Sequence, residues 1–323
     1  MRVKSKELFL SATAFFLCLI SVWAAVRGVW WMPVAKWELP KAELPDPSWE
    51  ALTLSLDKKA QAFSGRVGIY LKDLKSERIW AYHAEDLFPS ASLVKLPILL
   101  TVFEKIKQGE LSLQTPVTLR ASHRMGGSGT LKRHRPGAVF SLEDVLEHMM
   151  AQSDNTAMRM VIDLVGMDYL QQTFPKLGLT YTNIHPSGLS LTHRSVQKEN
   201  YTTAQEMAGL LERTYRGEFG DEELSRNMLE LLKHIKRRSR LTAGLPLGWQ
   251  IAHKTGLLRR ACHDAGIIFS PEGDFVLCVL TGQNPSYKRA KRFIAEVAKT
   301  TYKYYGSDSS ILAHAAAEAE EGG

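Results

Sequence analysis

The stretch Phe88-Pro89-Ser90-Ala91-Ser92-Leu93-Val94-Lys95, continued by the apolar run LPILLTVF up to residue 103, decides how this 323-residue chain is interpreted. A turn of small residues leads into apolar positions three and four apart, which predicts a helix over 93–108. Ser92 stands where that helix begins. Free backbone N–H groups and the positive end of the helix dipole favour developing negative charge there.

Ser92 and Lys95 form a Ser-x-x-Lys motif. Residues three apart share one face of a helix, so Lys95 can hydrogen-bond the Ser92 hydroxyl. A lysine that burial keeps neutral could also take the proton of that hydroxyl. The motif alone also fits an incidental pair on a surface helix, since it occurs three times, at Ser55/Lys58, Ser92/Lys95 and Ser195/Lys198. Only the second match stands at the start of a strongly apolar helix.

Two further motifs follow in the order of a known constellation. Ser153-Asp154-Asn155 lies between two predicted helices, and Lys254-Thr255-Gly256 closes a predicted strand. With Ser-x-x-Lys they make the set typical of class A β-lactamases and penicillin-binding proteins, which this chain resembles from about Leu52 to Tyr305. Gly127-Ser128-Gly129-Thr130-Leu131 and Tyr201-Thr202-Thr203 are supporting matches.

The resemblance implies an α+β fold, in which helices flank a five-stranded antiparallel sheet and a helical lobe is inserted into it. The site would lie in the cleft between lobe and sheet. It also implies an active-site serine hydrolase in which Ser92 attacks an amide carbonyl and Lys95 acts as the base. The backbone N–H groups of Ser92 and Leu257 would form the oxyanion hole.

The remaining site residues would hold the substrate. By the same resemblance, Ser153 would relay a proton to the departing nitrogen and Asn155 would hold the substrate's side-chain amide. Lys254, Thr255 and Gly256 would bind its carboxylate. Asp154 is expected to brace the loop rather than react. The expected partner is a β-lactam or a D-alanyl peptide.

One element of the class A pattern is missing. Class A enzymes carry a Glu, on a loop before the Thr-Thr element, that activates the water which clears the acyl-enzyme. Residues 169–198 contain no Asp or Glu. We therefore expect ready acylation but slow deacylation, as in a penicillin-binding protein or a D-alanyl peptidase. His185, His193 or Glu199 could replace the base, although a loop histidine is more often inert.

Three alternatives stay open on the sequence alone. The chain could be a true β-lactamase that uses another base and confers antibiotic resistance. It could be a non-catalytic receptor that captures a β-lactam or wall peptide covalently. A structural wall-associated domain with a dead site is disfavoured, because no member of the nucleophile set is absent.

Elsewhere the periodicity predicts strands before and after a mostly helical middle. Alternating apolar residues indicate the strands 66–71, 78–82, 250–253, 265–269 and 275–281. Apolar spacing of three and four indicates the helices 51–63, 141–151, 156–165, 203–215, 222–236 and 286–305. The last helix is expected to pack beside the first one on the sheet.

The N-terminal segment is expected to place the protein outside the cytoplasm. Residues 8–26 are uncharged and follow Arg2, Lys4 and Lys6, which is typical of a membrane span or a long signal segment. Trp23 makes clean cleavage doubtful, so we expect an anchor over 1–28 and an extracytoplasmic, membrane-anchored protein. A Trp- and Pro-rich spacer over 29–50, a catalytic domain over 51–306 and a disordered tail over 307–323 would follow.

Composition excludes several other classes of protein. The hydrophobic share of 45% and charged share of 23% are those of a folded domain. The net charge of +7 is concentrated in basic runs at 120–135 and 233–240. We interpret these runs as solvated faces, or as faces attracted to anionic lipid or wall polymer, and expect no nucleic-acid partner. No metal-ligand spacing and no phosphate loop occur, so no metal and no cofactor is expected.

Cys262 and Cys278 flank a predicted hairpin and could pair after export, but unpaired structural roles are at least as compatible with the sequence. The natural substrate and the oligomeric state stay open.

Overall fold

The computed structural model describes residues 47–189, 198–220, 222–233 and 238–306. The predicted anchor 1–28, most of the spacer 29–50 and the tail 307–323 lie outside these ranges. Within them, no helix has both the length and the apolar character needed to cross a membrane.

A five-stranded antiparallel sheet forms the centre of the fold and confirms the predicted α+β class. Its strands are β1 (Arg66–Asp73), β2 (Ile79–Tyr82), β7 (Gln250–Leu258), β8 (Ala261–Phe269) and β9 (Phe275–Gly282). Their order is β2-β1-β9-β8-β7, so the N-terminal hairpin pairs with the C-terminal strands and β7 forms one edge. β8 and β9 are buried along almost their whole length, which their β-branched and apolar composition allows.

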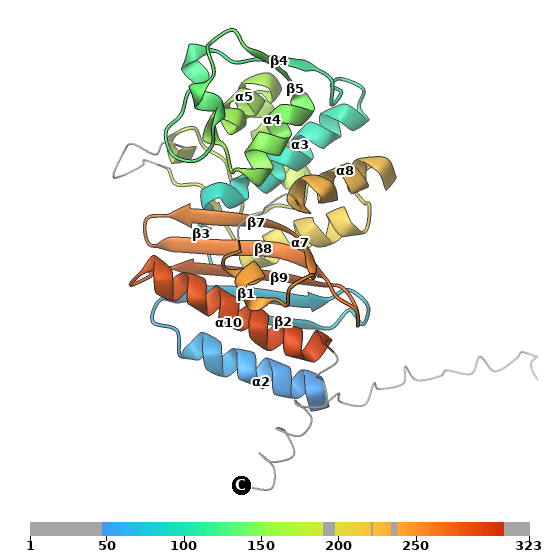
Figure 1. Ribbon diagram of the computed structural model, residues 1–323, viewed down its shortest axis with the longest axis vertical. Helices are drawn as coiled ribbons and strands as arrows, with labels where there is room; N and C mark the ends of the chain where they lie inside the picture. The colour runs from blue at the N-terminus through green and yellow to red at the C-terminus, as the bar shows by residue number, and fades with distance from the viewer. Residues whose placement is uncertain (1–46, 190–197, 221, 234–237, 307–323) are drawn as a thin grey trace, which may run out of the picture. The chain divides into compact units, whose positions relative to one another are not determined.

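Helices α2 (Pro47–Gln61) and α10 (Tyr287–Tyr305) cover one face of the sheet and lie side by side, as predicted (Figure 1). Aromatic pairs join them at both ends. The rings of Phe63 and Phe293 lie 4.3 Å apart, and those of Trp49 and Tyr304 lie 5.6 Å apart. Each such pair stabilises the fold by about 0.5–1.5 kcal/mol beyond the stabilisation that comes from the area it buries.

A helical lobe is inserted between β2 and β7 and packs against the other face of the sheet (Figure 1). Its helices are α3 (Lys95–Lys107), α4 (Leu142–Ala151), α5 (Asn155–Val165), α6 (Met167–Lys176), α7 (Ala204–Tyr215) and α8 (Glu222–Lys233). Shorter elements are the 3-10 turns η1 (Ala91–Val94), η2 (Ala121–His123), η3 (Leu131–Arg133) and η4 (Ser187–Leu189), the helix α9 (Leu241–Gly244), and the strand pairs β3 (Phe88–Pro89) with β6 (Tyr201–Thr202) and β4 (Pro116–Thr118) with β5 (Val139–Ser141).

Several element boundaries differ from the prediction, and one helix of the lobe was not predicted. Helix α2 starts at Pro47, inside the predicted extended spacer, because proline is well tolerated in the first turn of a helix. Helix α6 was not predicted; Gly166, with φ 90°, breaks it from α5. β7 continues to Leu258, so Lys254-Thr255-Gly256 lie within the strand rather than at its end. The pairing with β8, joined by a two-residue turn, extends the strand beyond its apolar start.

Cys262 and Cys278 are both free thiols. In the antiparallel register Cys278 is paired with Ala265, and side chains directly opposite each other share a face of the sheet. Cys262 is three positions from Ala265 on β8 and therefore points to the opposite face. One thiol lies in the core under α2 and α10 and the other in the core of the lobe. The possible disulfide between them is excluded.

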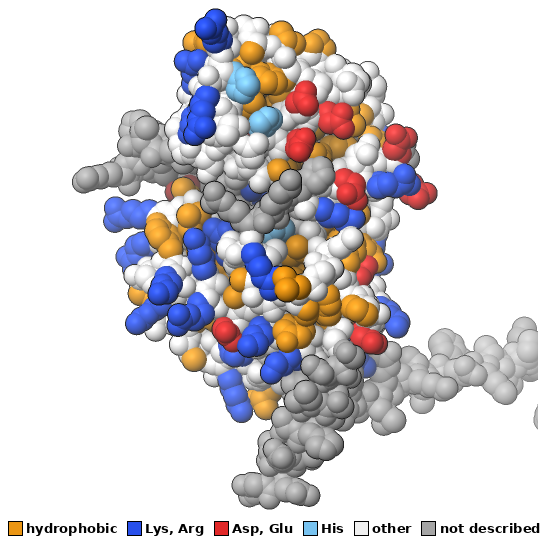
Figure 2. Space-filling view, in the orientation of Figure 1, with side chains coloured by type: hydrophobic (Ala, Val, Ile, Leu, Met, Phe, Trp, Pro, Cys, Tyr) orange, Lys and Arg blue, Asp and Glu red, His pale blue; other side chains and the backbone are white. Residues whose placement is uncertain are grey.

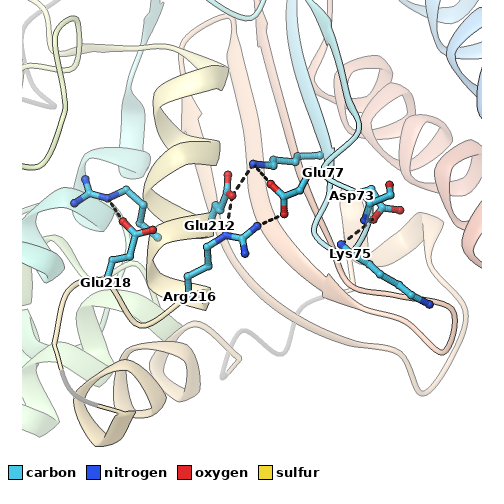
Figure 3. Close-up of polar contacts among 9 residues, drawn as sticks. Asp73, Lys75, Glu77, Glu212, Arg216 and Glu218 are labelled. Atoms are coloured by element: carbon cyan, nitrogen blue, oxygen red, sulfur yellow. Dashed lines mark hydrogen bonds and ion pairs between the residues drawn. The ribbon is translucent and has the colours of Figure 1, made fainter. Parts of the chain in front are cut away.

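A network of charges fixes α7 to the β1–β2 hairpin (Figure 3). Lys72 Nζ lies 2.6 Å from Glu212 Oε1 and 2.8 Å from Glu77 Oε2, and Arg216 bonds the same two carboxylates. Burial alone would lower the pKa of Lys72, but the hydrogen bonds to Glu212 and Glu77 outweigh burial and raise it. Both cations contact both carboxylates, and Glu212 is the more buried of the two, with 17% of its side chain exposed against 53% for Glu77.

Replacing Glu212 by Gln is expected to lower the free energy of unfolding by about 1–2 kcal/mol, because two partly buried cations lose the more buried of the two carboxylates that they share. Glu218→Gln is the matched control. It removes a surface carboxylate whose one ion pair among the described residues is with Arg213, and should cost below about 0.5 kcal/mol. Urea unfolding measures the free energy of unfolding of both variants and of wild type. If both variants lost the same free energy, the network would add nothing beyond surface ion pairing.

Candidate active site

Ser92 lies in the turn η1, directly before α3 begins at Lys95. The turn is held from two sides. The backbone N–H of Ser90 donates to the carbonyl oxygen of Asn200 at 2.6 Å. His263 Nε2 contacts the carbonyl oxygen of Pro89 at 2.8 Å. Ala91 has φ 49°, a left-handed conformation that bends the chain sharply just before the serine.

Lys95 is fully buried and lies between Ser92 and the Ser-Asp-Asn motif. Its Nζ lies 3.5 Å from Ser92 Oγ, 3.1 Å from Ser153 Oγ, 2.6 Å from the Ser153 carbonyl oxygen and 2.9 Å from Asn155 Oδ1. Burial, and then the nearby charge of Lys254, hold the pKa of Lys95 well below its usual value, while Asp154 acts in the opposite direction. The neutral amine, which can accept a proton, is therefore easier to reach for Lys95 than for an exposed lysine.

Asp154 organises the loop that faces the serine. Its Oδ1 accepts from the N–H groups of Thr156 and Ala157 and so caps α5, and its Oδ2 accepts from those of Thr130 and Leu131. Gly129 allows this close approach, since a Cβ at that position would lie 2.0 Å from Asp154 Cγ. All four contacts are backbone N–H groups, so the geometry agrees with a bracing role for Asp154.

The neighbouring Ser153 and Asn155 point to the lysines and to the loop. Ser153 has φ 54°, and its hydroxyl lies 3.0 Å from Lys254 Nζ as well as 3.1 Å from Lys95 Nζ. Asn155 Nδ2 donates to the Gly126 carbonyl oxygen at 3.0 Å. Ser153 is thus the hydroxyl that both buried lysines share.

β7 supplies the opposite wall of the site from the edge of the sheet. Lys254 is fully buried, and burial lowers its pKa to about 7, with Asp264 raising it and Arg240 lowering it further. A Cβ on Gly256 would meet His263 and Ala91 at 3.0–3.3 Å, so glycine lets β7 pack close to η1. Leu257 is 45% exposed and, with Thr255, borders the open side of the site.

A cavity of about 770 Å³ opens between lobe and sheet. It is lined by Ser92, Ser128, Gly129, Thr130, Glu147, Ala151, Gln152, Ser153, Ser239, Arg240, Lys254, Thr255, Leu257 and Lys291. Sequence reasoning missed Arg240 and Lys291. Arg240 ends a basic run that was interpreted as solvated, but it is only 8% exposed and donates from Nε to Cys262 Sγ. That interpretation is wrong for this residue.

Two of the three alternative bases, His185 and Glu199, are not brought to the cavity. His185 is half-buried, its backbone N–H donates to Asn200 Oδ1, and Glu199 accepts the N–H of Asn200. Neither lines the cavity, and His193 lies outside the described residues. Among the described lining residues, Glu147 on α4 is the one carboxylate. Within the residues that the structure describes, no group of three or more His, Cys, Asp or Glu residues is placed to hold a metal ion.

His263 is a positioning residue that no sequence motif marked. The N–H of Thr281 donates to its Nδ1, which leaves Nε2–H to donate to Pro89. Burial lowers the pKa of His263 to about 4, with a further contribution from Arg240. The neutral imidazole therefore ties the turn before Ser92 to the centre of the sheet.

The comparisons agree with this geometry. A family model described as "Beta-lactamase enzyme family" matches residues 51–305. The chain is 25% identical to beta-lactamase VEB-1 of Pseudomonas aeruginosa over 272 residues, which cover 79% of this chain and 90% of the relative.

Solved structures show the same fold. The structure titled "Structure of PBP-A" superposes with a TM-score of 0.73 at 27% identity, covering 79% of this chain and 95% of that one. A substituted form of PBP-A, described as an acyl-enzyme complex with penicillin G, gives a TM-score of 0.71 at 27% identity, covering 81% and 99%. The fold is thus of the β-lactamase and transpeptidase type.

The lowered pKa of His263 predicts that the stability of the protein depends on pH. Because its folded pKa of about 4 lies below the ordinary value of 6.5, the unfolded chain binds the proton more readily. Stability should fall as the pH drops from about 6.5 to about 4, by roughly 3 kcal/mol, and this contribution should change no further below that. Unfolding of wild type and His263→Gln, compared across this pH range, measures it. If the free energies of unfolding of the two proteins differed by the same amount at every pH, this role of His263 would be contradicted.

Proposed function

The chain belongs to the beta-lactamase enzyme family, and from this premise we propose that it is an active-site serine hydrolase that forms an acyl-enzyme at Ser92. Its substrates would be β-lactams and D-alanyl peptides, and its acyl-enzyme would be released slowly. The single observation that carries the proposal is the position of Lys95, a buried amine with a lowered pKa in reach of Ser92.

Acylation begins at Lys95. The neutral amine takes the proton of Ser92 as Oγ attacks the amide carbonyl carbon of the substrate. The distance of 3.5 Å between Nζ and Oγ is long for a hydrogen bond, and catalytic contacts of this kind often shorten only when substrate is bound. The carbonyl oxygen then carries negative charge, which the backbone N–H groups of Ser92 and Leu257 would stabilise.

The C–N bond breaks when the departing nitrogen receives a proton. Ser153 can deliver it, because its hydroxyl contacts both Lys95 and Lys254. Lys95 gained a proton from Ser92, so a transfer from Lys95 through Ser153 returns the base to its neutral state. Protonated Lys254, with Thr255 and Gly256, would bind the substrate carboxylate, and Asn155 would hold the side-chain amide.

Deacylation lacks the loop carboxylate that serves as its base in class A enzymes. The segment 169–198 has no carboxylate, and His185 and Glu199 do not line the cavity. A water molecule that attacks the acyl-enzyme must lose a proton, so its attack should be slow without a group to accept that proton. This supports a penicillin-binding protein or D-alanyl peptidase over a fast β-lactamase.

The proposed setting is the outer face of the membrane. The uncharged run 8–26 behind three basic residues supports an N-terminal anchor, and the spacer 29–50 would separate the catalytic domain from the bilayer. D-alanyl peptides of peptidoglycan would be within reach there.

Two other functions remain as alternatives, each with one observation in its favour. Glu147 lines the cavity and could serve a true β-lactamase as the base. The absence of a loop carboxylate would suit a covalent receptor that never releases its ligand. The rate of product release separates these functions.

The test is to mix the full chain with a fluorescent penicillin and, separately, with a chromogenic cephalosporin, and to follow the adduct by intact mass. We expect an adduct that persists for minutes or longer, with little colour change, and that Ser92→Ala abolishes. Ser55→Ala is the matched control, since it removes the serine of another Ser-x-x-Lys match, on α2, and should leave the adduct intact.

Rapid colour with no lasting adduct would contradict slow release and indicate a true β-lactamase; loss of that colour in Glu147→Gln would identify its base. An adduct that survives Ser92→Ala would remove the nucleophile assignment. Wild type that gives neither adduct nor colour would remove the substrate assignment.

A further inference from the structure

The first turns of α10 carry positive charges, which are unfavourable at the N-terminal end of a helix. Ser286 caps the helix by accepting the N–H of Arg289, and Lys288, Arg289, Lys291 and Arg292 follow, with no acidic residue in the first turn. The positive end of the dipole disfavours these cations. Like charges three and four positions apart, such as Lys288 with Arg292, repel each other as well. The helix start therefore gives up stability, which suggests that these cations serve a function.

The cations continue beyond the helix. The β7–β8 turn carries Arg259 and Arg260, both exposed. Arg260 is held beside the start of α10, because its carbonyl oxygen accepts the N–H of Asn284 and its guanidinium donates to the Gln283 carbonyl oxygen. With Lys59 at the end of α2, these residues form what we term the basic strip: Lys59, Arg259, Arg260, Lys288, Arg289, Lys291 and Arg292. Figure 2 shows Lys and Arg side chains gathered on this part of the surface.

The charges of the basic strip are not neutralised within the described part of the chain. None of its members forms an ion pair with a described residue. Lys59, Arg289 and Arg292 line an open hollow of about 320 Å³, together with the aromatic side chains of Phe63 and Phe293. Glu296 is the one carboxylate in its lining. The strip thus offers unpaired cations to an anion from outside.

The strip reaches the catalytic cavity. Lys291 lines that cavity together with Ser92 and Lys254. β7 runs from Lys254 past the exposed Leu257 to the turn at Arg259. A peptide whose terminal carboxylate lies at Lys254, and which follows the edge of β7, would therefore extend toward the strip. A bilayer surface could touch the strip, but it could not enter the cavity.

We propose that the basic strip binds the substrate beyond its reactive end, and that the preferred substrate is a polyanionic strand, a D-alanyl peptide with further free carboxylates along its length. The inference rests on the proposed function and deepens it. Lys254 and Thr255 would bind the terminal carboxylate, and the strip would bind the others. Charge complementarity of this kind raises the rate of encounter and weakens with salt.

The experiment compares two synthetic peptides of equal length that end in D-alanyl-D-alanine, one with two free side-chain carboxylates and one with both amidated. Each competes with the fluorescent penicillin for Ser92, so that turnover is not needed. We expect wild type to prefer the carboxylate form at low salt. Arg259→Ala/Arg292→Ala should reduce that preference about tenfold, the loss expected for two exposed ion pairs.

Arg159→Ala/Lys176→Ala is the matched control, because it removes two positive charges from exposed residues of the lobe that do not line the cavity. It should keep the preference. Both double variants should react with the fluorescent penicillin alone within about twofold of wild type, since neither changes a cavity residue. The melting temperature of the strip variant should be unchanged or higher, because Arg292→Ala relieves repulsion at the start of α10.

The proposal would be overturned if wild type did not discriminate between the peptides, or if the control lost the preference as well. Binding to vesicles of phosphatidylglycerol tests whether the basic strip binds the membrane instead. Vesicle binding that the strip variant abolishes, while the peptide preference survives, would assign the strip to the membrane instead. Normal labelling of Ser92 by penicillin without peptide discrimination would end this inference alone, whereas absent labelling would end the proposed function.

Discussion

Lys95 and Lys254 are both fully buried and lie on either side of one hydroxyl, that of Ser153. Two ammonium groups in such a place are costly, since each loses several kcal/mol of hydration and the like charges repel. Burial eases this constraint by lowering the pKa of both groups, and the nearby charge of Lys254 lowers the pKa of Lys95 further. A lysine with a lowered pKa gives up its proton more readily and can then accept one, so the cost of burial also favours Lys95 as a base.

The rest of the fold holds these lysines together. Lys95 comes from the lobe and Lys254 from the edge of the sheet, and each core is closed by contacts far apart in the sequence. Asp154 fixes the lobe side through four backbone N–H groups, and His263 ties the turn before Ser92 to the sheet. The glycines at 129 and 256 let both sides approach closely. The site is therefore a product of packing between two layers rather than of one motif.

Much of this could be predicted from the sequence, for reasons that particular residues show. Ser92, Lys95, Ser153 and Lys254 were predicted because each sits in a short motif, and the structure brings them together within hydrogen-bond reach or around one cavity.

His263 and Arg240 were missed because their roles depend on partners far away in the chain, Pro89 for the first and the cavity wall for the second. The extension of β7 was missed, and the separation of the two cysteines was left open, for a related reason. Strand pairing register decides both, and a local pattern does not fix register.

The most direct measurement is the protonation state of Lys95 itself. Lysine labelled with ¹³C at Cε, in the full chain and in a Lys95→Arg variant that assigns the resonance, would be followed by NMR over a range of pH. The role of Lys95 as a base predicts that its resonance changes from that of the ammonium to that of the neutral amine well below the ordinary pKa of 10.5. A resonance that stays that of the charged ammonium up to about pH 10 would contradict the role of Lys95 as the base for Ser92.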